Sequence, residues 1–132
     1  RTKQKTFKLM THQLNFVYND SDWIAPAEYP DLRQAKEIAI DLETKDPNIK
    51  TKGAGWATFD GGIVGFAVAA LGQQWYFPIQ HDAGGNMDLT ITTAWFQDIL
   101  NLPATKIFHN ASYDVGWLLV NGFKIDGCCS SH

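Results

Sequence analysis

The stretch Glu37-Ile38-Ala39-Ile40-Asp41-Leu42-Glu43 decides the fold class of this chain. From Ile38 onward every second residue is a large aliphatic one, which is the period of a β-strand with one apolar face. The opposite face carries Asp41 and Glu43, whose Cα atoms in a strand are about 6.5 Å apart. Two interpretations of this pair remain open: a solvated face on an edge strand, or two carboxylates that reach one cation.

The residues that follow predict a long loop and then two more strands. The segment from Lys45 to Gly62 is rich in Lys and Gly and is expected to be the loop. The apolar segments Ile63–Ala69 and Gln74–Ile79 are separated only by a short link containing Gly72, so they predict an antiparallel hairpin. Pro78 places the second of these strands near an edge of the sheet.

Helical and extended segments alternate in the rest of the chain. Helical spacing of apolar residues predicts helices over Leu89–Leu100 and Asn110–Val120, with a short buried strand at Lys106–Phe108 between them. Gly122 suits the residue that closes the second helix, and Phe123–Asp126 is expected to begin another strand. This order of elements predicts an α/β fold with a mixed sheet flanked by helices.

Length and composition limit the organisation and the class of protein. The 132 residues are 45% hydrophobic, which suits one core and excludes a wholly disordered chain. The longest apolar run, Ile63–Leu71, is far shorter than the roughly 20 residues that span a bilayer, so no membrane partner is expected. Cys128 and Cys129 are adjacent, which excludes a disulfide framework and favours a reducing cytoplasm. The net charge of -3 is unlike that of a domain that holds duplex DNA by phosphate neutralisation alone.

A second polar motif, His109-Asn110-Ala111-Ser112-Tyr113-Asp114, lies where a strand is expected to meet a helix. Each residue has a structural explanation when taken singly. Asn110 suits a helix cap, Asp114 is favoured near the positive end of the helix dipole, and Tyr113 suits an apolar core.

Taken together, the strand that ends in Asp-x-Glu and the later junction that reads Asn-x-x-Tyr-Asp resemble the first and second motifs of the DEDD superfamily of 3′ to 5′ exonucleases. The sequence is further similar to the proofreading domain of bacteriophage-type family A DNA polymerases. Three stretches carry that likeness: Asp22-Trp23 with Pro26 and Pro30, Asp41–Pro47, and the turn Pro78–His81 with Gly84-Gly85-Asn86. The resemblance implies a ribonuclease H-like fold, a phage protein in the cytoplasm of a bacterial host, and hydrolysis of 3′-terminal nucleotides of single-stranded DNA.

The resemblance also implies a site. Three carboxylates are expected to be catalytic and to ligate metal: Asp41, Glu43 and Asp114. Three further residues are expected to bind the substrate: Thr44 and Asn110 would hold the 3′-terminal nucleotide, and Tyr113 would pack along the bound strand. The cofactors are expected to be two divalent ions, Mg²⁺ or Mn²⁺, which would clamp the attacking and leaving oxygens. The expected partners are the 3′ end of a single DNA strand and a polymerase domain in the same parent chain.

The sequence departs from the family at its end, because no third motif with a Tyr or His and the fourth Asp is present. The expected organisation is a lead-in segment over 1–36, a partial exonuclease domain over 37–127 and an atypical tail over 128–132. Two roles for the tail are disfavoured: His132 as the missing base, and a zinc site formed by Cys128, Cys129 and His132. Little or no turnover is expected from the 132 residues. The alternatives are an exoribonuclease of the same superfamily and a non-catalytic module that binds single strands or supports a neighbouring domain.

Overall fold

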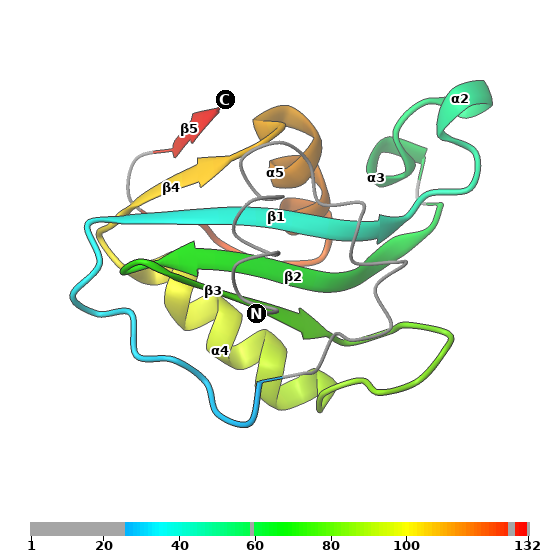
Figure 1. Ribbon diagram of the computed structural model, residues 1–132. Helices are drawn as coiled ribbons and strands as arrows, with labels where there is room; N and C mark the ends of the chain where they lie inside the picture. The colour runs from blue at the N-terminus through cyan, green and yellow to red at the C-terminus, as the bar shows by residue number, and fades with distance from the viewer. Residues whose placement is uncertain (1–25, 59, 127–128, 132) are drawn as a thin grey trace.

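The computed structural model describes residues 26–58, 60–126 and 129–131, which form a mixed sheet in the order β3-β2-β1-β4-β5 (Figure 1). Its strands are β1 (Glu37–Lys45), β2 (Gly62–Ala70), β3 (Gln73–Pro78), β4 (Thr105–Phe108) and β5 (Cys129–Ser131). Its helices are α2 (Ile49–Lys52), α3 (Gly55–Thr58), α4 (Leu89–Asn101) and α5 (Ala111–Val120). Asp22-Trp23, Cys128 and His132, each named above, lie outside the described residues.

The central strand of the sheet is β1, which is antiparallel to β2 and parallel to β4. β2 and β3 form the predicted hairpin through Leu71 and Gly72, whose φ angles of 54° and 74° are typical of the tight turns that match strand twist. β3 ends the sheet on one side, as Pro78 predicts, because proline donates no hydrogen bond to a further strand. The predicted α/β architecture with a mixed sheet is therefore confirmed.

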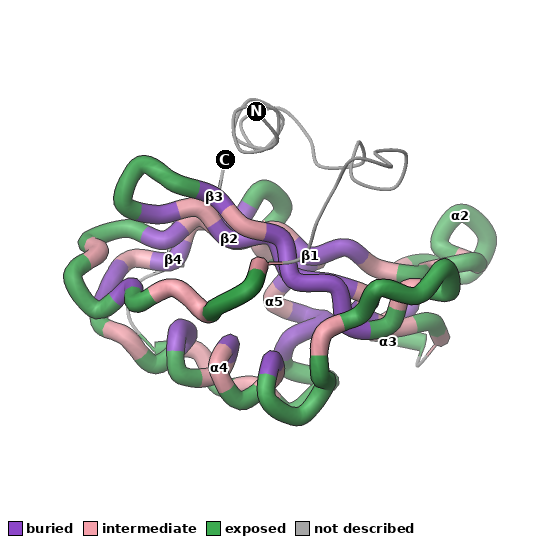
Figure 2. The backbone as a smooth tube through the Cα atoms, turned by 60° about the horizontal axis from the view of Figure 1, so that its bottom comes forward, coloured by how far each residue is buried: buried purple, intermediate pink, exposed green. Residues whose placement is uncertain are grey.

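Side-chain caps begin the two long helices. Asp88 accepts a hydrogen bond from the backbone nitrogen of Ile91 at the start of α4, and Asn110 accepts one from that of Tyr113 at the start of α5. Figure 2 shows α4 and α5 on the same side of the sheet. The apolar face of β1 therefore faces these helices, and the face with Asp41 is turned away from them.

Aromatic rings fill the core between the sheet and the helices. Phe66 on β2 stacks on Phe96 of α4 at 4.0 Å between ring centroids, and Phe123 meets both rings edge-on. The described part of the predicted lead-in segment adds to this core, since Leu32 is 1% exposed and Tyr29 stacks on a ring of β3. The buried core therefore begins before the first strand.

Two expectations from the sequence are wrong. The predicted loop over Lys45–Gly62 contains the short helices α2 and α3, which have four residues each and so show no periodicity. Phe123–Asp126 forms no strand, and the chain next pairs with the sheet only at β5. Asp126 instead donates its backbone N–H to the carbonyl of Leu100, and the buried ammonium group of Lys106 donates to the carbonyl of Asp126 at 2.8 Å. Among the helices of the described residues, none has the length and apolar composition that a bilayer crossing needs.

Candidate active site

Strand β1 positions two carboxylates on the face turned away from α4 and α5. Asp41 pairs with Ala67 of β2 and Glu43 with Gly65, so both side chains project to the same side, as predicted. Glu43 is only 2% exposed, whereas Asp41 is half-buried. The pairing register shifts directly after Glu43, and such irregularities re-aim the side chains that follow.

The third predicted carboxylate, Asp114, lies in the first turn of α5 and is 2% exposed. Its Oδ2 atom is buried and has no hydrogen-bond partner among the described residues. Burial and, to a smaller extent, repulsion from Asp41 together raise the pKa of Asp114 to about 8. Helix α5 and strand β1 thus bring two carboxyl groups within electrostatic range of each other.

Burial also raises the pKa of Asp41, to about 6. Attraction to His109 and a hydrogen bond with the backbone of Leu42 act in the opposite direction but are weaker. The two neighbouring carboxyl groups repel each other when both are charged, and a bound cation would relieve that repulsion.

The assembly of a metal centre is incomplete. Within the described ranges, no three His, Cys, Asp or Glu side chains lie close enough together to hold a metal ion. The structure couples Asp41 and Asp114, but it does not gather both with Glu43 into one group of ligands. The metal-ligand assignment therefore stays a prediction.

The predicted substrate-binding residues divide into two groups. Thr44 and Tyr113 lie together, because their hydroxyl oxygens are 3.0 Å apart, although Thr44 belongs to β1 and Tyr113 to α5. Asn110 is exposed, and its side-chain oxygen serves as the helix cap. The structural explanation for Asn110 therefore holds, while its contact with a nucleotide stays a prediction.

Sequence reasoning assigned no role to Asp46, yet this residue connects the site. Its Oδ2 atom accepts hydrogen bonds from the hydroxyl of Tyr113 at 2.7 Å and from the backbone nitrogen of Gly55 at 2.9 Å. Asp46 thereby ties the end of β1 to α3 and α5. The sequence feature that could have identified Asp46 is that it is a third carboxylate shortly after the Asp-x-Glu motif.

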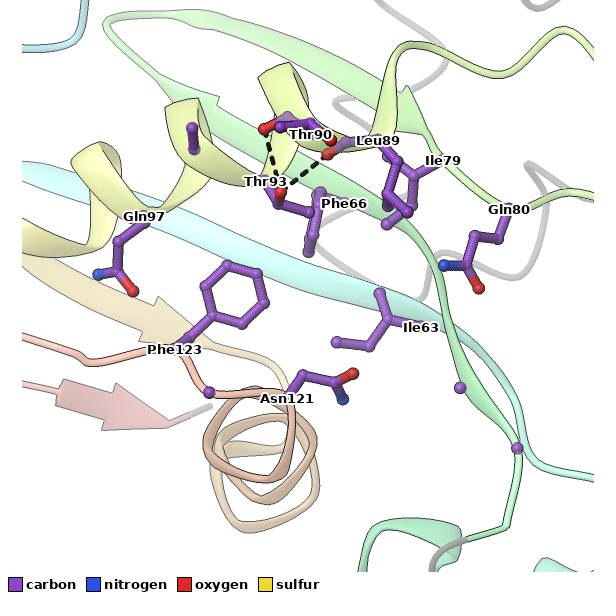
Figure 3. Close-up of a pocket in the computed structure, with 14 residues that line it drawn as sticks. Ile63, Phe66, Ile79, Gln80, Leu89, Thr90, Thr93, Gln97, Asn121 and Phe123 are labelled. Carbon is purple, nitrogen blue, oxygen red and sulfur yellow. Dashed lines mark hydrogen bonds between the residues drawn. The ribbon is translucent and has the colours of Figure 1, made fainter.

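A cavity of about 690 Å³ lies elsewhere, between α4, the start of β2 and residues 121–123 (Figure 3). Phe66 lines this cavity and pairs with Leu42, so the cavity is on the helix-covered face and not on the face of Asp41. None of its lining residues carries a charge. It is therefore separate from the acidic site.

The fold and the site together define an α/β protein whose central strand and second long helix carry neighbouring buried carboxyl groups. No protein-family model matches the chain. The chain is similar to a DNA-directed DNA polymerase of Pseudomonas phage M6, to which it is 31% identical over 121 residues. The match covers 84% of this chain but only 18% of the polymerase, so it concerns a small part of that protein.

Proposed function

We propose that this chain is part of a 3′ to 5′ exonuclease domain that proofreads for a DNA polymerase and acts on the 3′ ends of single-stranded DNA. The observation that carries the proposal is the neighbouring pair of the half-buried Asp41 and the buried Asp114. Each residue comes from one of the two motifs that resemble the exonuclease family, and the fold brings them into electrostatic range. The similarity to a phage DNA polymerase supports a polymerase-related role.

The topology supports the finer fold assignment as well. Three antiparallel strands followed by two parallel ones, in the order β3-β2-β1-β4-β5, agree with the ribonuclease H-like fold that the motifs imply. In such a fold the carboxyl ends of β1 and β4 meet at one edge of the sheet, where the second motif begins α5. This arrangement supports a single site built from both motifs.

The donor set suits divalent cations, since hard carboxylate oxygens are the ligands that Mg²⁺ and Mn²⁺ prefer. Asp41, Glu43 and Asp114 are the residues that would hold them, and the partnerless Oδ2 of Asp114 supplies a free donor atom. Bound ions would supply charge stabilisation for phosphodiester hydrolysis. The chain itself contributes the orientation of these carboxylates, since Thr44, Tyr113 and Asp46 bond the end of β1 to α5.

Binding is the appropriate test, because the proposal assigns the residues that hold the cations and the DNA strand. The experiment measures fluorescence anisotropy of a 5′-labelled single-stranded oligonucleotide in Mn²⁺ and in EDTA. We expect Mn²⁺ to increase the affinity, and Asp41→Ala and Asp114→Ala to lose that increase. Asp98→Asn, which changes an exposed carboxylate on α4, is the matched control and should behave like the unsubstituted chain. An Mn²⁺-dependent affinity that survives both alanine substitutions would refute the site.

A non-catalytic module that binds single strands is the second candidate. The observation that favours it is that the described residues contain no preassembled group of three ligands. This candidate predicts that the oligonucleotide binds equally well in Mn²⁺ and in EDTA. The same titration therefore discriminates between the two functions.

A further inference from the structure

Strand β3 brings a tyrosine to the face that carries the carboxylates. Tyr76 pairs with Ala67, which in turn pairs with Asp41, so the three residues form one row across the sheet. The hydroxyl of Tyr76 lies over Gly65, where a Cβ atom would come within 2.1 Å of it. Since Gly65 is the partner of Glu43, this hydroxyl lies beside the position of Glu43.

The hydroxyl of Tyr76 is bonded to a histidine. Its oxygen is 2.5 Å from Nε2 of His81, and the two rings meet edge-on at 5.7 Å. His81 follows the end of β3, which is parallel to β1, so its ring lies at the edge of the sheet where β1 also ends. The pair therefore lies on the same face and at the same edge as the acidic site.

The loop holds His81 in place from both sides. Its backbone nitrogen donates to Oδ1 of Asn86 at 2.7 Å, and the Asn86 amide donates to its carbonyl at 2.9 Å. Next to it, Asp82 accepts a 2.7 Å hydrogen bond from Lys45 at the end of β1. The imidazole is therefore preorganised, which lowers the entropic cost of binding a ligand.

The chemistry of the ring follows from these contacts. Burial lowers the pKa of His81 from its ordinary value of 6.5, against a weaker attraction to Asp82, and so favours the neutral ring. When Nε2 accepts the Tyr76 proton, the ring proton lies on Nδ1. In the part of the chain that the structure describes, Nδ1 makes no hydrogen bond. A neutral N–H at this edge of the sheet is a donor suited to an oxygen of a phosphate group.

We propose that His81 donates its Nδ1–H to a phosphate oxygen of the bound single strand, and that Tyr76 is the positioning residue that sets this tautomer. This inference rests on the proposed function, because it places the phosphate of the DNA at the acidic site. The contact comes from β3 and its turn, outside both motifs that carry the family resemblance. It adds a contact on the β3 side of the site, whereas α5 follows β4 on the other side of β1.

The anisotropy titration in Mn²⁺ tests the contact. His81→Ala should weaken binding about tenfold, the equivalent of one hydrogen bond to a charged group. His81→Gln retains an acceptor and a donor and should restore part of the loss. Tyr76→Phe should weaken binding by a smaller factor, because it removes only the hydrogen bond that sets the tautomer of His81. Tyr29→Phe removes a comparable tyrosine hydroxyl bond, to Thr92 at 2.6 Å on the helix-covered face, and should have no effect.

A spectroscopic measurement on the unsubstituted chain keeps the test independent of folding. Long-range ¹H–¹⁵N spectra should show the Nδ1–H tautomer of His81, and thymidine 5′-monophosphate with the diamagnetic ion Mg²⁺ should shift its Nδ1 signal. The Nε2–H tautomer, or a folded His81→Ala chain that binds as tightly as the unsubstituted chain, would overturn the inference and leave the proposed function standing. If the unsubstituted chain shows no Mn²⁺-dependent binding, both the proposed function and this inference are overturned.

Discussion

Replacing Asp114 by Asn removes the carboxyl group whose pKa is raised more than that of Asp41. The pKa of Asp114 is about 8 in the folded chain, against an ordinary value of 3.8. At pH 7 the folded state must therefore hold a proton that the unfolded chain releases, which costs about 4 kcal/mol at about 1.4 kcal/mol per pH unit. Asparagine avoids this cost but buries an amide group, which costs about 1–3 kcal/mol if unpaired. We expect Asp114→Asn to stabilise the metal-free chain at pH 7 by about 2 kcal/mol, as the difference of these two terms.

The sign of the pH dependence follows from the raised pKa. An acid whose pKa is raised on folding contributes most stability below its ordinary pKa, and that stability is lost as the pH rises through the folded value. The unsubstituted chain should therefore lose about 3 kcal/mol between pH 5 and pH 7 through Asp114. Asp41, with a pKa of about 6, acts in the same direction. In Asp114→Asn the decline should be shallower, and the gain over the unsubstituted chain should nearly vanish at pH 5.

Urea unfolding in EDTA, followed by the fluorescence of the five tryptophans, measures these changes. With an m-value of about 1–3 kcal/mol/M, a gain of about 2 kcal/mol raises the midpoint by roughly 1 M. Asp98→Asn is the control and should stay within about 0.5 kcal/mol of the unsubstituted chain at both pH values. Equal slopes of stability against pH in Asp114→Asn and in the unsubstituted chain would refute the assigned environment of Asp114.

Three further changes test the packing around the site. Gly116→Ala would place a Cβ 2.4 Å from the indole of Trp56, so we expect a destabilisation of about 1–3 kcal/mol in urea unfolding. Tyr113→Phe removes the hydroxyl that donates to Asp46; we expect a loss of about 1–3 kcal/mol in the same assay and a weaker Mn²⁺-dependent affinity for the oligonucleotide. Phe66→Ala removes the ring between α4 and the sheet and should lower stability by about 3–5 kcal/mol, measured as a thermal shift. If a substituted chain unfolds at the same urea concentration or temperature as the unsubstituted chain, the packing described for that residue is contradicted.

The elements that the sequence predicted well are those with a strong period or clear turn chemistry. Strand β1 has strict alternation, the β2–β3 hairpin has a Gly72 turn, and α4 has both an apolar stripe and an Asp88 cap. The short helices α2 and α3 were not predicted, because a helix of four residues is too short to show a periodic pattern. Phe123–Asp126 looked like a strand from its composition, but Phe123 is used in the aromatic core and the backbone of Asp126 bonds to Leu100.

The candidate site was predictable only in part for a related reason. Period-two alternation alone places Asp41 and Glu43 on one face, and the register confirms that placement. The closeness of Asp41 to Asp114 depends on the parallel pairing of β4 with β1, which brings the start of α5 to β1. Spacing in the sequence does not encode this pairing. The pairing of Tyr76 with His81 depends on how the loop after β3 turns back, and side-chain bonds from Asn86 determine that path.

The two faces of the sheet assign stability and binding to different residues. The helix-covered face holds the stacked rings around Phe66, where a truncation removes packing without touching a carboxylate. The acidic site, formed by the Asp41 face of β1 and the start of α5, concentrates groups that cost stability when no cation is present, as the raised pKa of Asp114 indicates. Sites kept for binding at the expense of stability are common in proteins. Phe66→Ala should therefore destabilise the chain but retain its Mn²⁺-dependent affinity below the unfolding temperature, whereas Asp114→Asn should stabilise the chain and lose that affinity. If both substitutions shifted stability and affinity in the same direction, this separation by face would be wrong.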